Sequence, residues 1–398
     1  MEQNQNRAPR RRTPFQRNRR LQGELLSWLL VGCVVIFTVL GFITPDKDFS
    51  ESENRSLAQF PKFTLSALAD GSFLSDLGSY VADQFPSRDL WMSLNLKFNQ
   101  LMGQKEASGV YLGSDDYLIQ IPAEPNWAQV DRNMDAINTF SETYPTLNMV
   151  MCVAPNAITV HADKLPENAP TRDQEADLAA LQEKLTGATF VDVTRTLKRH
   201  NSNYLYYKTD HHWTSLAAAY AYQEIAPVMS LYNPDLESYK VYTVSDSFEG
   251  TLSSKSGSHA ARDTVEIYVP DTNIQYYVSY PDGTDVRSFY KREALDQKDH
   301  YTVFFGGNYP RLDITTTANT GRSLLMFKDS YANCMVQFLY PYFDHITMID
   351  PRYYSDNVDL VIRSESITDV LFLYNLDTFL GDTSLADVLA VEEVTVEE

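Results

Sequence analysis

The chain has 398 residues, of which 43% are hydrophobic and 12% aromatic, enough for one large core or two modest ones and too apolar for a disordered protein. Its formal net charge is -20, unevenly spread: residues 1–20 hold seven Arg and one Glu, so the other 378 residues carry 26 Lys and Arg against 52 Asp and Glu. So acidic a body argues against nucleic acid as a partner.

The first element of the chain is an apolar run near its start. Leu25 to Ile43 comprises nineteen residues without a charge, and a helix rising ~1.5 Å per residue over that length nearly spans a hydrocarbon core of ~30 Å. The run is longer than the apolar core of a cleaved secretory signal. The sequence therefore predicts an uncleaved transmembrane signal anchor over residues 21–44, with a buried core helix as the alternative.

The charges on either side of this anchor predict its orientation. Residues 1–20 form a disordered basic tail that the positive-inside rule keeps in the cytoplasm. A polar stalk over residues 45–65 and a folded domain over residues 66–398 then lie outside the cell. We therefore expect a single-pass protein of the cell membrane with an extracytoplasmic domain.

The folded domain begins with a helical pattern and then alternates strands with helices. Apolar residues recur at threes and fours over residues 66–102, with a break at DQFPSRD. The next expected elements are a hairpin, a helix, a buried strand as apolar as a central parallel strand requires, a helix and a short strand, over Val110–Ile121, Asn126–Tyr144, Leu147–Val153, Arg172–Leu185 and Thr189–Val193. This alternation predicts an α/β fold with a doubly wound parallel sheet.

The stretch Tyr206–Tyr222 places an acid, two imidazoles and an indole within four residues, Asp210 to Trp213. Thr214 is a good N-cap and Ala217–Ala221 favours helix. The four side chains are therefore expected on a short loop at a helix N-terminus, where functional groups converge. An Asp that holds a His fixes the imidazole tautomer and stabilises the imidazolium, but the pair needs a nucleophile from elsewhere.

Residues 236–320 interrupt the alternation with short extended segments rich in Tyr, Thr and Val, among them YTVFFGG at residues 301–307. We expect a β-rich insertion here. It would form a small subdomain or a cap over the sheet edge.

A candidate nucleophile follows this insertion. Ser323–Phe327 predicts a buried strand, Lys328–Ser330 a sharp turn and Tyr331–Tyr340 a helix. A serine on a tight turn between a strand and a helix is exposed, and its backbone N–H serves as an oxyanion donor. Two more strands of the α/β pattern are expected over His345–Asp350 and Thr368–Asn375.

Each of these motifs alone has an ordinary structural explanation. A serine such as Ser330 is usually a helix cap, and Asp210, His211 and His212 by themselves fit a polar core cluster or a two-histidine metal site. Found together at the loop positions of an α/β sheet, Ser330, His212 and Asp210 favour a catalytic triad over these alternatives.

The three cysteines carry little information about function. Cys33 lies in the predicted membrane segment, and Cys152 and Cys334 lie in apolar settings that suit free thiols, with a disulfide between them as the alternative. No Cys and His spacing indicates zinc, so we expect neither a metal nor a cofactor.

The string TDHHW, followed much later by KDSYAN, resembles the DHHW family of Gram-positive bacteria, which is similar to the alginate O-acetyltransferases and more remotely to SGNH hydrolases. The resemblance covers most of the chain beyond the anchor, and its other strings are SENRSLAQFP (52–61), DQFPSRD (83–89), APN (154–156), FEGTL (248–252), GGNYP (306–310) and IDPRYY (349–354). It implies a three-layer α/β/α sandwich. The acid and base string D-x-H-W of those acetyltransferases maps onto Asp210, His212 and Trp213, and their nucleophile maps onto Ser330.

The order of the motifs differs from that of ordinary SGNH hydrolases, in which the serine comes first and the acid and base last. A circular permutation reconciles the two orders and makes Asn375 the candidate side-chain oxyanion donor, beside the Ser330 N–H. Asn308 is its rival, and both residues have ordinary capping or turn roles as alternatives. Arg352 is a candidate anchor for an anionic or sugar group, with a structural ion pair as the alternative. His211 is expected behind the site or facing substrate.

The resemblance implies a membrane-anchored extracytoplasmic O-acetyltransferase that acts on a cell-surface or exported polysaccharide through an acyl-serine intermediate. Acetyl-CoA is cytoplasmic, so a polytopic membrane-bound O-acyltransferase would supply the acetyl group. Two alternatives remain open from the sequence: a carbohydrate acetylesterase with the same triad, and a non-catalytic glycan-binding or assembly scaffold.

Overall fold

A computed structural model describes residues 14–50 and 55–390 of the chain. It divides into two compact units, Met1–Asn95 and Leu96–Glu398. This division falls later in the chain than residue 66, where we expected the folded domain to begin. Part of the predicted basic tail, residues 1–13, lies outside the described residues.

The first unit is helical. Helix α1 contains the one span, Gln22–Ile43, that is long and apolar enough to cross a membrane among the residues described, which suits a signal anchor and a signal peptide alike. Residues 14–20, expected in a disordered tail, belong to this helix. The elements of the unit are α1 (Pro14–Ile43), β1 (Phe49–Ser50), antiparallel β2 (Arg55–Ser56), α2 (Leu65–Ala69), α3 (Ser72–Asp83) and α4 (Arg88–Leu101), which runs past the division.

The second unit is built on an eight-stranded sheet with the order β11-β10-β12-β14-β13-β15-β6-β7. Five neighbouring strands, from β14 to β7, are parallel. The strands of the sheet are β6 (Asn148–Ala154), β7 (Thr189–Val191), β10 (Tyr276–Ser279), β11 (Asp285–Val286), β12 (Arg311–Thr316), β13 (Ser323–Lys328), β14 (His345–Ile349) and β15 (Asp369–Asn375).

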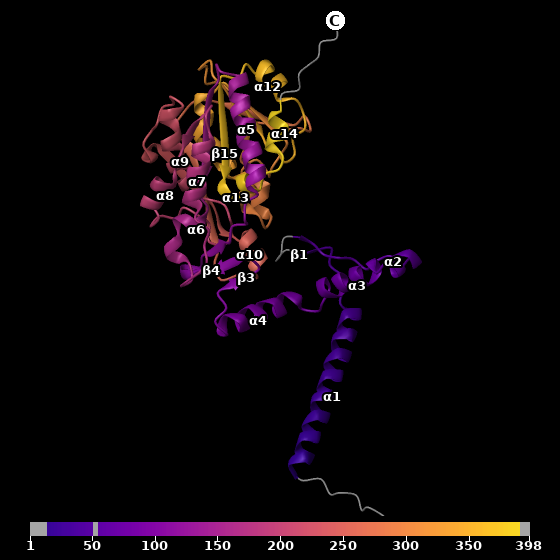
Figure 1. Cartoon of the computed structure of the whole chain (residues 1–398). Coiled ribbons are helices and arrows are strands. Elements are labelled where there is room, and N and C mark those ends of the chain that lie inside the picture. The colour runs from indigo at the N-terminus through magenta and orange to yellow at the C-terminus, as the bar shows by residue number, and fades with distance from the viewer. Residues whose placement is uncertain (1–13, 51–54, 391–398) are drawn as a thin grey trace, which may run out of the picture. The chain divides into compact units, whose positions relative to one another are not determined.

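Helices cover both faces of this sheet. Successive residues of a strand point to opposite faces, and in a strand that is apolar throughout both sets of side chains must be buried. Val150 and Cys152 of β6 belong to a core with α9 and α11, whereas Met149 and Met151 belong to a core with α5, α7 and α12–α14. Figure 1 shows β15 between α9 on one side and α5, α12 and α14 on the other. The helices are α5 (Trp127–Thr143), α6 (Ala157–Val160), α7 (Gln174–Lys184), α8 (Thr194–Arg199), α9 (Ser215–Val228), α10 (Thr251–Ser256), α11 (Val336–Leu339), α12 (Val358–Ser364), α13 (Leu376–Gly381) and α14 (Leu385–Leu389).

This arrangement is the α/β sandwich that the alternation of strands and helices predicts, with a mostly parallel central sheet and an N-terminal apolar helix. The predicted hairpin at residues 110–121 is present as β4 (Val110–Leu112) and β5 (Leu118–Gln120), joined by β3 (Glu106–Ala107) in a small antiparallel sheet. The predicted cap is also present: the Thr214 side chain accepts a hydrogen bond from the Ala217 N–H at the start of α9.

The β-rich insertion differs from a cap over the sheet edge. Its strands β10, β11 and β12 continue the central sheet, because β12 pairs antiparallel with β14. Only β8 (Tyr239–Phe248) and β9 (Asp263–Pro270) form a separate two-stranded sheet. The segment at 301–307, expected to be extended, instead begins in the 3-10 helix η5 (His300–Val303).

The helix expected over residues 331–340 is also interrupted. It consists of the 3-10 helix η6 (Ser330–Cys334), the single α-helical turn of α11 and the 3-10 helix η7 (Tyr340–Tyr342). The apolar residues of this segment therefore predicted that it is buried, but they did not predict whether it forms an α-helix or a 3-10 helix. The remaining 3-10 helices are η1 (Ser114–Asp116), η2 (Ala162–Lys164), η3 (Leu236–Ser238) and η4 (Arg292–Asp296).

Candidate active site

The candidate site lies where parallel strands end. The strands β6, β13 and β15 are parallel neighbours, so Asn156, Ser330 and Asn375, which follow or end them, lie along the same edge of the sheet. Asp329 fixes the turn that carries Ser330: its carboxylate accepts hydrogen bonds from the Tyr331 N–H at 2.8 Å and from the Asn375 N–H at 2.9 Å. Two strands thereby hold the serine turn in place.

Three residues predicted from the sequence form one chain of hydrogen bonds. The Ser330 hydroxyl lies 2.7 Å from His212 Nε2, and His212 Nδ1 lies 2.5 Å from Asp210 Oδ1. Asp210 also accepts the His212 backbone N–H at 3.0 Å. The side chain of Asp210 is 1% exposed and that of His212 is 7% exposed, so bulk water does not weaken this chain.

Asp210, the acid of this hydrogen-bonded series, is held by residues of the insertion. The Thr251 N–H and the Thr251 hydroxyl each donate to Asp210 Oδ2 at 2.8 Å. Burial by itself raises the pKa of Asp210, but His211, His212 and these hydrogen bonds outweigh it and hold that pKa below its ordinary value. Asp210 is therefore a carboxylate at neutral pH.

Gly250 allows this close approach. A Cβ atom at residue 250 would lie 2.3 Å from Asp210 Cβ and 2.5 Å from Asp210 Oδ2, which is closer than side-chain atoms pack. The string FEGTL therefore contributes a glycine for space and a threonine for hydrogen bonds. Sequence reasoning noted this string but assigned no role to Gly250 or Thr251.

Aromatic rings hold the imidazole of His212. The ring of Tyr301 stacks on it with centroids 3.8 Å apart, and the Tyr301 hydroxyl donates to the Ser330 carbonyl at 2.8 Å. Trp213 is buried and its Nε1–H donates to the Tyr331 carbonyl at 2.9 Å. Trp213 therefore braces the serine turn, whereas Tyr301, which sequence reasoning missed, comes from the segment expected to be a strand.

No residue in the described part of the chain accepts a hydrogen bond from the Ser330 N–H, so this group is available for the oxyanion role expected of it. Asn375 is different: its amide nitrogen donates to Asp329 at 2.5 Å and to the Thr378 hydroxyl at 2.7 Å. Both amide hydrogens have acceptors, so we correct the expectation that Asn375 donates to an oxyanion. It is the N-cap of α13.

Asn308 and Arg352 are exposed, and each bonds a buried charged residue, Lys328 or Asp350, at the end of a neighbouring strand. Lys328 donates to Asn308 Oδ1 at 3.1 Å, and burial lowers the pKa of Lys328 to about 8. The guanidinium of Arg352 binds Asp350 through two hydrogen bonds, at 2.8 and 2.6 Å. These contacts fit the structural ion pair that was the alternative for Arg352, and they turn the Asn308 carbonyl toward Lys328.

Two groups of described residues have the donor atoms for a metal ion, Asp210 with His211 and His212, and Asp313 with His345 and Glu365. In the first group both nitrogens of His212 already have hydrogen-bond partners, so metal binding would disrupt the chain to Ser330. In the second group both carboxylates pair with Arg311. Neither arrangement favours a cation over the bonds present.

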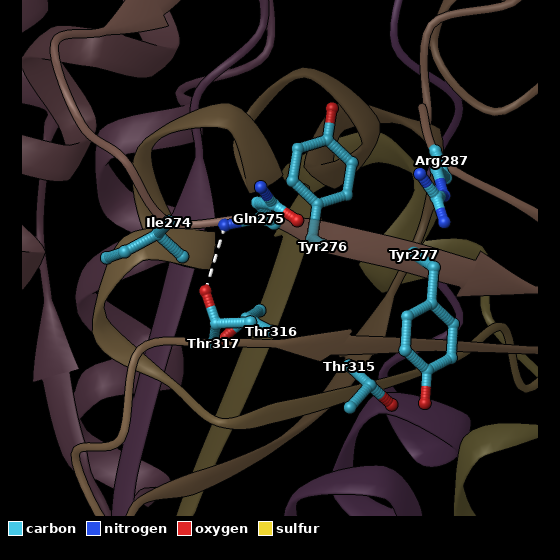
Figure 2. Close-up of a pocket in the computed structure, with 8 residues that line it drawn as sticks. All are labelled: Ile274, Gln275, Tyr276, Tyr277, Arg287, Thr315, Thr316 and Thr317. Carbon is cyan, nitrogen blue, oxygen red and sulfur yellow. Dashed lines mark hydrogen bonds between the residues drawn. The ribbon is translucent and has the colours of Figure 1, made fainter.

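A separate hollow lies over the antiparallel strands β10 and β12 (Figure 2). Its volume is about 380 Å³, and its lining includes Tyr277, Arg287 and Thr317, whose hydroxyl accepts the Gln275 N–H at 3.0 Å. None of the site residues predicted from the sequence lines it. Cys152 and Cys334 are both buried free thiols, which removes the alternative of a disulfide.

Comparison with known proteins agrees with this architecture. Residues 124–284 match the family model of the SGNH hydrolase-like domain of the acetyltransferase AlgX. That segment contains Asp210 and His212 but ends before Ser330. No curated protein matches the chain.

Two solved structures have the same fold. A DHHW family protein from Eubacterium siraeum superposes with a TM-score of 0.62 at 24% identity, covering 71% of this chain and 95% of the other. Bacillus cereus PatB1, solved with a sulfonyl adduct, gives a TM-score of 0.58 at 23% identity, covering 69% of this chain and 98% of the other. The chain thus has an SGNH hydrolase-like α/β fold, and its predicted resemblance to the DHHW family and the SGNH-like acetyltransferases is confirmed.

Proposed function

We propose that this protein is an extracytoplasmic O-acetyltransferase that moves acetyl groups onto a polysaccharide through an acyl-Ser330 intermediate. The observation that carries the proposal is the chain of hydrogen bonds from Asp210 through His212 to Ser330. It unites a buried carboxylate, an imidazole of fixed tautomer and a hydroxyl on a strand-to-helix turn, the three groups that acyl transfer needs.

In the first half-reaction Ser330 becomes acylated. His212 Nε2 takes the hydroxyl proton while the Ser330 oxygen bonds to the acetyl carbon of the donor, and the Ser330 N–H stabilises the oxyanion. Asp210 stabilises the imidazolium. The bond from the acetyl carbon to the donor then breaks, and the leaving oxygen or sulfur takes the proton from His212.

In the second half-reaction a sugar hydroxyl replaces water as the attacking group. His212 removes its proton as the sugar oxygen bonds to the acetyl carbon. The bond to Ser330 breaks, and His212 returns the proton to the Ser330 oxygen. The products are an O-acetylated sugar and the free enzyme.

The apolar helix α1 supports a place for this chemistry at the outer face of a membrane. In the proposal Gln22–Ile43 is an uncleaved anchor, the Arg-rich residues 1–20 stay in the cytoplasm and the rest lies outside. A polytopic acyltransferase passes acetyl from cytoplasmic acetyl-CoA across the bilayer. The anchor then keeps this protein beside its donor.

The test uses a sulfonyl fluoride, because PatB1 was solved with a sulfonyl adduct. Phenylmethylsulfonyl fluoride should add one sulfonyl group at Ser330, and Ser330→Ala and His212→Ala should each lower hydrolysis of p-nitrophenyl acetate by orders of magnitude with the fold intact. The matched control Ser364→Ala, in α12, should leave labelling and hydrolysis unchanged.

Transfer is then measured with cellopentaose as acceptor, by mass spectrometry of acetylated product. Acetylated cellopentaose supports the transferase. Acetate release with no sugar product from a panel of bacterial polysaccharides indicates the esterase instead. A folded protein that neither labels at Ser330 nor turns over the ester contradicts the proposal and indicates a scaffold.

A further inference from the structure

The carboxylate of Asp210 serves two imidazoles. It contacts His212 directly, and it contacts His211 through the hydroxyl of Thr251. Thr251 Oγ1 lies 2.8 Å from Asp210 Oδ2 and 2.8 Å from His211 Nδ1. The proposed mechanism uses only the first of these imidazoles.

The bonds around Thr251 determine the tautomer of His211. A threonine hydroxyl has one hydrogen, and here it faces a carboxylate that has none to offer, so the hydrogen points to Asp210. The same oxygen must then accept from its other neighbour, since two lone pairs at 2.8 Å would repel. His211 therefore carries its proton on Nδ1, and its Nε2 holds a lone pair.

That lone pair is available to a ligand. The side chain of His211 is 31% exposed, against 7% for His212. Its Nε2 atom has no hydrogen-bond partner among the described residues, and this atom is not buried. The two rings lie side by side with centroids 4.0 Å apart. Burial and the neighbouring His212 lower the pKa of His211 to about 4, so it is neutral at neutral pH.

We propose that His211 positions the acceptor sugar: Thr251 fixes its imidazole with the proton on Nδ1, and Nε2 accepts a hydrogen bond from the hydroxyl next to the one that is acetylated. The inference rests on the proposed function and specifies its acceptor as a vicinal diol of a sugar ring. One hydroxyl gives its proton to His212 and attacks the acetyl carbon, and its neighbour donates to His211. Water and simple alcohols lack the second hydroxyl, so His211 favours transfer over hydrolysis.

The first test reads the tautomer without any activity. In the full chain in detergent, labelled with ¹⁵N at histidine, the His211 signals are identified among the seven histidines as those missing from His211→Phe. Nδ1 is expected to show a directly bonded proton and Nε2 the shift of an unprotonated nitrogen at neutral pH. A proton on Nε2 would overturn the inference.

The second test compares acceptors after acylation by p-nitrophenyl acetate. His211→Phe keeps a ring but removes the acceptor nitrogen, and it should lower transfer to cellopentaose at least tenfold more than it lowers transfer to ethanol or acetate release. His211→Gln offers an amide oxygen near the Nε2 position and should recover part of the transfer. His200→Phe, whose ring stacks on Tyr220, is the matched control.

The outcomes separate the two proposals. If wild-type protein forms no acyl-Ser330, the proposed function fails, and the tautomer measurement still decides the state of His211. If wild-type protein transfers acetyl but His211→Phe lowers all three rates equally, His211 does not position the sugar and the inference fails alone. If His211→Phe does not fold, His211→Gln is compared with His211→Asn instead. The shorter Asn side chain does not reach the Nε2 position, so His211→Asn should lose the transfer that His211→Gln retains.

Discussion

Gly250 and Asp210 make the closest approach in the site, and this contact yields the sharpest prediction for a single residue. Gly250→Ala puts a Cβ within 2.3 Å of Asp210 Cβ, so the two segments must shift apart and the contact between Asp210 and His212 is disturbed. A displacement of about 1 Å in a catalytic group costs on the order of 10²-fold in rate. We expect a loss of that size in hydrolysis of p-nitrophenyl acetate, with folding unchanged by circular dichroism.

Gly381 provides the control for this substitution, because nothing lies within 4 Å of a Cβ built there. Gly381→Ala should hydrolyse the ester at the wild-type rate. Full activity of Gly250→Ala would mean that the position of Asp210 does not limit the reaction, and the proposed role of the acid would then be wrong.

Asp299 has a raised pKa, which predicts how stability depends on pH. Burial first, and then the neighbouring carboxylate of Asp210, raise the pKa of Asp299 from 3.8 to about 6. The folded state therefore holds a proton that the unfolded chain releases. The stabilisation this provides is complete below pH 3.8 and is lost as the pH rises through about 6.

Asp299→Asn removes this dependence and keeps an oxygen that can accept the Tyr301 N–H, as Asp299 does at 3.1 Å. We expect the variant to be more stable than wild type at pH 8 by about 1 to 3 kcal/mol. The difference should shrink toward pH 4. Thermal unfolding of both proteins across this range measures it, and a difference independent of pH would show that the carboxyl of Asp299 does not titrate with folding.

The predictability of the site differs from residue to residue. Asp210, His212 and Ser330 could be found from the sequence because they lie in short motifs of reactive residues. The strand and helix predicted on either side of each motif place it on a loop. Thr251 and Tyr301 could not, since they come from an insertion whose path over the sheet depends on tertiary packing. Asn375 was placed correctly at the end of β15 but given the wrong role, because only the structure reveals that Asp329 and Thr378 take its hydrogens.

At the scale of elements, burial on both faces decided what could be predicted. The strands β6, β13 and β15 read as continuous apolar runs, and their order along the chain places them in a parallel sheet. Strand β12 has the sequence RLDITT, in which charged and polar residues alternate with apolar ones. Such a pattern fits an edge or a separate hairpin as well as it fits the central sheet, so its pairing with β14 did not follow from the sequence.

The start of strand β9 holds the loop that precedes Asp210. The buried carboxylate of Asp263 accepts the Lys208 N–H at 2.7 Å, the Thr209 N–H at 2.7 Å and the Thr209 hydroxyl at 2.5 Å, and it also bonds the Tyr204 hydroxyl. Asp263→Ala leaves these donors without an acceptor, at about 1 to 3 kcal/mol for each buried group. We expect a loss of at least about 3 kcal/mol in urea unfolding and a large loss of esterase activity.

Asp271→Ala is the matched control for Asp263→Ala, since Asp271 directly follows the same strand and its side chain is 82% exposed. It should change the free energy of unfolding by less than about 0.5 kcal/mol. If Asp263→Ala were as stable as Asp271→Ala, the two-stranded sheet would not hold the Asp210 loop. The insertion would then extend the central sheet without helping to position Asp210.

At the scale of the whole molecule, the chain joins an acidic second unit to an apolar helix preceded by Arg residues. The negative charge of residues 21–398 repels the anionic surface of a bilayer. In the proposed topology, attachment to the membrane therefore depends on α1 and not on surface charge. The proposed anchor is then separable from the candidate site, because the strands and helices that form this site all lie in the second unit.

The last prediction follows from that separation. The full chain should stay in the membrane pellet through extraction with alkaline carbonate and through high salt, because an apolar helix of 22 residues buries its side chains in lipid. A chain without residues 1–43 should be soluble and hydrolyse p-nitrophenyl acetate at a rate within about twofold of the full chain in detergent, since the side chains around Ser330 come from residues 156–378.

Protease added outside intact cells should degrade the domain but spare an epitope placed before residue 20. A mature protein in the medium that begins after Ile43 would instead identify α1 as a cleaved signal peptide, and acetyl transfer would then have to occur away from the membrane.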